Sequence, residues 1–112
     1  MRVKDLVERY NLEVEAGEKG LNREVQLGHC GDLLSEVIAN AGQGAVWITV
    51  QGHQNIVAVA VLRELAAVVI ASGNRPDPET CEKAEAEGIP ILSYAGQAYE
   101  LAGRLYSDGI AS

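Results

Sequence analysis

The chain has 112 residues, which is too few to divide a hydrophobic core in two, so we expect one domain over residues 1–112. Its formal net charge is −7 and its nine Lys and Arg residues are scattered, which argues against binding to nucleic acid or to an anionic membrane surface. The longest apolar run, residues 56–71, is interrupted by Arg63 and Glu64 and is therefore no membrane span.

Two features of the sequence indicate the cellular compartment. The first ten residues lack the apolar core of a signal peptide, and we expect the protein to stay in the cytoplasm. Its two cysteines, Cys30 and Cys81, fit a reducing compartment, where free thiols act mainly as small core residues.

Apolar spacing predicts the elements of the first quarter of the chain. A short amphipathic helix is expected over residues 3–10, followed by a half-exposed strand over 12–16. The polar segment 18–23 reads as a loop. Alternation resumes at Val25 and gives a second strand, which ends at residues 28–31.

The middle of the chain alternates strictly between helix and strand. Asp32 can cap a helix that runs through Ile38. Residues 45–50 form the first central strand, and Asn55 or a near neighbour should cap the apolar helix that follows. Residues 67–71 form the second central strand.

The last third contains the clearest helix start. Asp77, Pro78 and Glu79 combine a capping carboxylate, a proline at the first helical position and an acid at the positive end of the helix dipole. This helix ends before Gly88. A short strand follows over 89–92, where Pro90 indicates a strand start or an edge, and residues 97–106 form the closing helix.

This order predicts an α/β fold with an open, mainly parallel sheet flanked by helices. The two central strands should be parallel, because a helix crosses over between them. The polar turns 51–55 and 72–75 then lie at the carboxyl ends of both strands, where ligands bind in open α/β sheets.

The two turns offer an imidazole, amides, a hydroxyl, a guanidinium and flexible backbone, which suit a phosphate or carboxylate. The candidate ligand-binding residues are Gly52, His53, Asn55, Ser72, Gly73, Asn74 and Arg75. Solvated turns with no ligand explain the same residues, and we give the two interpretations equal weight.

Catalytic and metal chemistry have weaker support. The chain has no GxxxxGK[ST] element, so catalysis of the P-loop kind is excluded, and no cofactor is assigned. His29, Cys30, His53 and Cys81 match no compact zinc pattern, which favours structural roles. Cys30 becomes a reactive thiol only if it faces the helix that starts at Asp32.

The helix over residues 56–62 is apolar on every side, whereas covering a sheet needs one apolar face. Its outer side must be covered, either by the helix at the N-terminus or by a second copy of the chain, and a twofold homodimer is the simplest cover. A partner protein is the alternative, which makes the chain an interaction adaptor that docks through this helix.

The chain resembles the DRTGG domain in residues 31–41, 46–76 and 84–92, and the likeness extends over about residues 3–107. It is similar to small stand-alone bacterial DRTGG proteins and to the N-terminal domain of HPr kinase/phosphorylase, without the kinase domain. The family is named after an Asp-Arg pair following the first central strand and a Thr-Gly-Gly following the second. Here Gly52-His53 stands in the first place and Ser72-Gly73-Asn74 in the second.

The resemblance implies an open α/β fold, a regulatory or ligand-sensing role and a tendency to dimerise, and it implies no reaction. Together with the polar turns it predicts a non-catalytic module that binds a nucleotide or another small anionic ligand at the carboxyl ends of the central strands.

Overall fold

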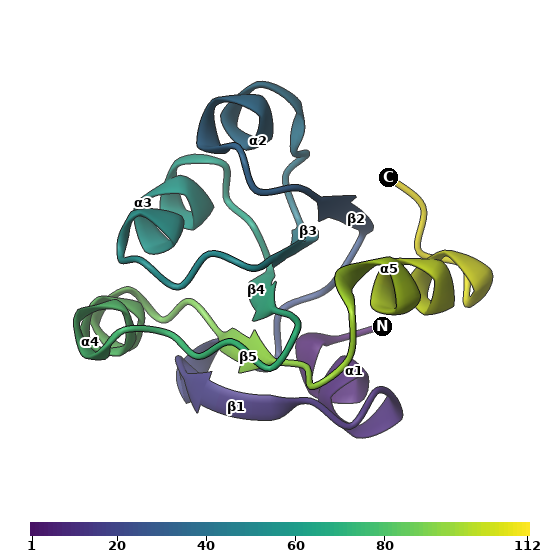
Figure 1. The fold of residues 1–112 in the computed structure, drawn as a ribbon, viewed down its shortest axis with the longest axis horizontal. Coiled ribbons are helices and arrows are strands. Elements are labelled where there is room, and N and C mark those ends of the chain that lie inside the picture. Colours follow the sequence, from purple (N-terminus) through teal and green to yellow (C-terminus); the bar gives the residue numbers. More distant parts are fainter.

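The computed structural model describes residues 1–112 and places one five-stranded sheet between two layers of helices (Figure 1). The strands are β1 (Glu13–Ala16), β2 (Leu27–Cys30), β3 (Ala45–Thr49), β4 (Ala67–Ile70) and β5 (Ile91–Ser93). The helices are α1 (Val3–Arg9), α2 (Leu34–Asn40), α3 (Asn55–Leu62), α4 (Pro78–Glu87) and α5 (Ala98–Ser107), with a 3₁₀ turn at Glu18–Gly20.

The sheet order is β1-β5-β4-β3-β2. Strands β2, β3, β4 and β5 are parallel to one another, and only β1 runs antiparallel, paired with β5. The two central strands are thus parallel as predicted, with Trp47 opposite Val68 in the register. The predicted α/β class with a mainly parallel sheet is confirmed.

Alternation along the strands divides the core between the two faces of the sheet. Trp47 of β3 and Val68 of β4 pack with apolar residues of α2, α3 and α4. Val46 and Val69 belong to the opposite cluster, to which α1 and α5 contribute. Both faces are therefore covered, which is typical of parallel strands.

Helix α3 is less covered than its composition predicts. Four of its eight residues are buried, namely Ile56, Val57, Val59 and Ala60. Val61 and Leu62 are 43% and 64% exposed. The helix buries only the side that faces the sheet. Helix α1 packs on the opposite face of the sheet and does not cover the outer side of α3, so that part of the prediction is wrong.

Of the two helix starts for which a cap was predicted from a polar residue alone, the first differs from the prediction and the second agrees with it. Leu33, not Asp32, occupies the N-cap position of α2, because the Asp32 carboxylate bonds the neighbouring strand instead. At α3 the cap is a near neighbour of Asn55: the Nδ1 atom of His53 accepts the Asn55 N–H at 3.1 Å.

The start and end of α4 match the sequence. Asp77 is at the N-cap position and Pro78 is the first helical residue, although the Asp77 side chain makes no capping hydrogen bond. Gly88 ends the helix with φ of 68°, a conformation that favours glycine. Pro90 directly precedes β5, which is an internal strand and extends to Ser93, one residue beyond the predicted end.

Candidate functional site

The carboxyl ends of β2, β3 and β4 lie at one edge of the sheet because these strands are parallel. We call this edge, with the loops 31–33, 50–54 and 71–77 that follow the three strands, the carboxyl edge. All seven candidate residues lie on it or on the first residue of α3.

The structure brings the two predicted turns into contact. A Cβ on Gly52 would lie 2.6 Å from the carbonyl oxygen of Arg75, so only glycine allows this approach. The Gly52 carbonyl accepts a hydrogen bond from Thr80 Oγ1 at 2.6 Å. Asn74 Nδ2 donates to the Val50 carbonyl at 3.3 Å. The loops after β3 and β4 therefore form one continuous surface.

The loop after β3 carries unused hydrogen-bond donors. The backbone N–H groups of Gly52, His53 and Gln54 make no hydrogen bond within the protein, and they precede α3 directly. The next N–H, that of Asn55, is capped by the His53 ring. Unpaired N–H groups at the positive end of a helix dipole are suited to an anion.

The loop after β4 has most of its backbone donors engaged. The N–H of Ser72 donates to the Gly96 carbonyl at 2.7 Å, and that of Gly73 to the Tyr94 carbonyl at 3.1 Å. Ser72 and Gly73 both have positive φ, 64° and 70°. This loop is thus held against the segment after β5, and Arg75 carries its only backbone N–H without a hydrogen bond, so side chains are its main means of contacting a ligand.

The guanidinium of Arg75 lies against β1. Its Nη1 atom donates to Glu13 at 2.8 Å and to Glu15 at 2.5 Å, and Glu15 also accepts a hydrogen bond from Ser93. These hydrogen bonds, that to Glu13 first, raise the pKa of Arg75. The Arg75 backbone contacts Gly52 in the loop after β3, but the guanidinium lies at β1. Because β5 and β4 separate β1 from β3, the positive charge of Arg75 is not beside that loop.

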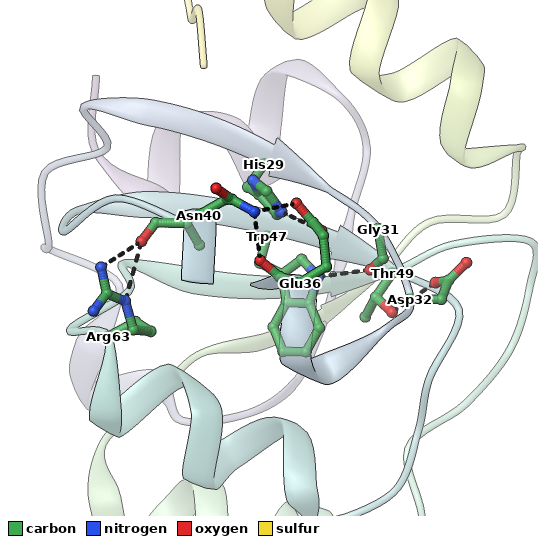
Figure 2. A network of polar contacts seen from close by, with 9 residues as sticks. His29, Gly31, Asp32, Glu36, Asn40, Trp47, Thr49 and Arg63 are labelled. Carbon is green, nitrogen blue, oxygen red and sulfur yellow. Dashed lines mark hydrogen bonds and ion pairs between the residues drawn. The ribbon is translucent and has the colours of Figure 1, made fainter. Parts of the chain in front are cut away.

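A second polar network at this edge was missed by the sequence analysis (Figure 2). Asp32 Oδ1 accepts from Thr49 Oγ1 at 2.8 Å and from the Val50 N–H at 2.9 Å. The indole N–H of Trp47 donates to the Gly31 carbonyl at 2.8 Å. These bonds attach the loop after β2 to β3. The only signal in the sequence was an acidic residue directly after a strand end, which we assigned to capping.

The His29-Cys30 pair separates across the sheet. His29 Nε2 lies 3.0 Å from Glu36 Oε1 of α2 (Figure 2), while Cys30 lines a cavity beneath α5. Burial, and then the Asp32 carboxylate, raise the pKa of Cys30. Cys30 thus faces α5 and not the helix that follows Asp32, so the condition set above for a reactive thiol is not met. Cys81 packs beside the core on the α2–α4 face, as expected of a structural thiol.

None of the helices has the length and apolar character that a bilayer crossing requires. No curated protein matches the sequence closely enough to count as a relative.

The fold is shared with a solved structure, the CBS and DRTGG domains of the regulatory region of Clostridium perfringens pyrophosphatase complexed with its activator, diadenosine tetraphosphate. The TM-score is 0.70 at 13% identity, over 98% of this chain. The present chain spans about half of that one, 47%. A family model, that of the DRTGG domain, matches residues 5–107. The chain therefore belongs to the DRTGG domain family.

Proposed function

We propose that this DRTGG domain is a non-catalytic regulatory module that binds a nucleotide or another small anion at the carboxyl edge. The observation that carries the proposal is the row of three unpaired backbone N–H groups at Gly52, His53 and Gln54, directly before α3. Such donors hold a phosphate without needing a basic side chain, which suits a chain of net charge −7.

A nucleotide is the favoured class of anion. The regulatory region with the same fold was crystallised with diadenosine tetraphosphate. That region contains CBS domains in addition to DRTGG. The likeness therefore supports the regulatory role and the class of ligand, and it supplies no contact for this chain. The contacts proposed here come from this chain alone.

The candidate side chains take different roles in this proposal. His53 and Asn55 flank the unpaired N–H groups, and Asn74 lies beside them through its bond to the Val50 carbonyl. Ser72 contributes its hydroxyl group from the loop after β4. Arg75 is exposed, and exposed ion pairs are weak in water, so a phosphate that reaches it competes with Glu13 and Glu15.

The decisive experiment removes one backbone donor. Gln54 has φ of −58°, which proline adopts without strain, so Gln54→Pro deletes the N–H at the start of α3. Gln54→Ala is the matched control, because it removes the side chain and keeps the N–H. The probes are ATP, diadenosine tetraphosphate and inorganic pyrophosphate, each tested by thermal shift and calorimetry.

A probe at 100 times its dissociation constant should add about 2.7 kcal/mol to the free energy of unfolding. We expect Gln54→Pro to weaken binding about tenfold, in line with one lost hydrogen bond to a charged group, and Gln54→Ala to leave it unchanged. If no probe raises the melting temperature, or if both variants bind equally, the anion site is wrong.

The adaptor function remains the second candidate, and the exposed apolar residues of α3 favour it. Val61 and Leu62 are exposed at the end of α3. On the neighbouring α2, the N-cap residue Leu33 and the helical residue Ile38 are also exposed. A homodimer through this surface is the simplest assembly. Light scattering at micromolar concentration should give twice the monomer mass of 11.9 kDa, and Leu62→Glu should return the monomer without unfolding it. A monomeric wild-type chain contradicts the homodimer.

A further inference from the structure

A cavity of about 330 Å³ lies between the edge strand β2 and helix α5, on the sheet face opposite α3. Its volume is within the range of small-molecule sites, about 300–1,000 Å³. Residues of β2, β3, α5 and the C-terminal segment line it, among them Cys30, Ile48, Ala102, Leu105, Tyr106 and Ile110.

The lining restricts the chemistry of any occupant. Six of the nine residues are hydrophobic, and the other three are Gly28, Ser112 and His29, whose imidazole is paired with Glu36 of α2 on the other face of the sheet. Burial raises the pKa of the Cys30 thiol, which disfavours its charged form. These side chains give a charged group no free ion-pair partner, so we expect the part of a ligand that enters the cavity to be uncharged.

Strand β2 supplies directional hydrogen bonds at the side of this cavity. It is the last strand of the sheet, and the Gly28 N–H donates to the Ala111 carbonyl at 2.9 Å, away from β3. Because backbone direction alternates along a strand, the Gly28 carbonyl and the Cys30 N–H point to the same side of β2 as the Gly28 N–H, away from β3. They form an acceptor–donor pair two residues apart.

An aromatic side chain stands at the rim. Tyr106 lines the cavity and is 69% exposed, with no hydrogen bond from its hydroxyl. A tyrosine in this position can stack on a flat ring whose edge meets β2. Apolar walls, an acceptor–donor pair and a stacking ring are complementary to one class of molecule.

We propose that the cavity between β2 and α5 binds a flat, uncharged heteroaromatic ring with an amine beside a ring nitrogen, as in adenine. The amine donates to the Gly28 carbonyl, the ring nitrogen accepts the Cys30 N–H, and one face of the ring stacks on Tyr106. This site is independent of the proposed anion site, because it uses no phosphate and none of the loops after β3 and β4.

The test uses adenosine, which has the ring and lacks a phosphate. The two cysteines give an internal control, since Cys30 lines the cavity and Cys81 lies on the opposite face of the sheet. Alkylation by iodoacetamide is followed by mass spectrometry. Adenosine at ten times its dissociation constant should slow the alkylation of Cys30 about tenfold and leave that of Cys81 unchanged.

Variants separate this cavity from unspecific binding. Ala102→Phe fills the cavity and should abolish adenosine binding in calorimetry, whereas Ala58→Phe, on the exposed side of α3, should not. Tyr106→Leu changes an exposed residue, so folding is retained and binding should weaken about tenfold. Gln54→Pro should leave adenosine binding unchanged, so this proposal and the anion site can fail separately.

Three results would overturn the proposal. The first is a Cys30 alkylation rate that millimolar adenosine does not alter. The second is equal protection of Cys30 and Cys81. The third is wild-type adenosine affinity in Tyr106→Leu, because a merely structural tyrosine would give that result.

Discussion

Replacing Thr49 by valine tests the bond that fixes the carboxyl edge. Thr49 is 1% exposed; its Oγ1 donates to Asp32 at 2.8 Å and accepts the Gln51 N–H at 3.2 Å. Valine keeps the shape and loses both bonds. A hydrogen bond to a charged group contributes about 1.5–3 kcal/mol, and Asp32 is solvent-exposed and retains the Val50 N–H, so we expect a loss near the lower end, about 1.5 kcal/mol.

In a domain of this size that loss corresponds to a fall of about 6 °C in the melting temperature. Trp47, the single tryptophan, is buried and bonded to Gly31 at the same edge, so its fluorescence reports urea unfolding directly. A double-mutant cycle with Asp32→Ala should give a coupling energy of about 1 kcal/mol. Equal costs of Thr49→Val with and without Asp32 would refute the reasoning.

Three further substitutions, one of them with a matched control, are checked by thermal and urea melts. Val59→Glu should prevent folding, because it buries an unpaired charge, while Ala58→Glu on the exposed side of α3 should change stability by less than about 0.5 kcal/mol. Gly52→Ala should cost about 1–3 kcal/mol, because its Cβ would lie 2.6 Å from the Arg75 carbonyl. Arg75→Ala should move the unliganded melting temperature by no more than a few degrees, since its ion pairs are exposed, and it should reduce the stabilisation by ATP.

The elements were predictable from the sequence where the signal is local. Asp77 and Pro78 at its start, with Gly88 after its end, are sufficient to place α4. Leu101 and Leu105 are one turn apart and both are buried, as the stripe on α5 predicts. Turns, caps and apolar periods act over a few residues, so they are visible without the fold.

The partners of polar side chains were not predictable in the same way. Asp32 bonds Thr49, 17 positions away, and Arg75 pairs with Glu15, 60 positions away. Both partners come from other strands of the sheet, and no local pattern encodes that choice. The sequence therefore located the carboxyl edge and left open which of its side chains are free to meet a ligand.

The departure from the family signature has a physical reading in this structure. By the resemblance in sequence, Gly52-His53 takes the place of the Asp-Arg pair that gives the family its name, and the space that a side chain on Gly52 would need is occupied by the Arg75 backbone. The nearby cation, Arg75, is held by two carboxylates. On the proposed function, affinity for an anion must then come mainly from the N–H groups of the loop before α3. Those donors belong to the backbone, so they survive the loss of the signature side chains.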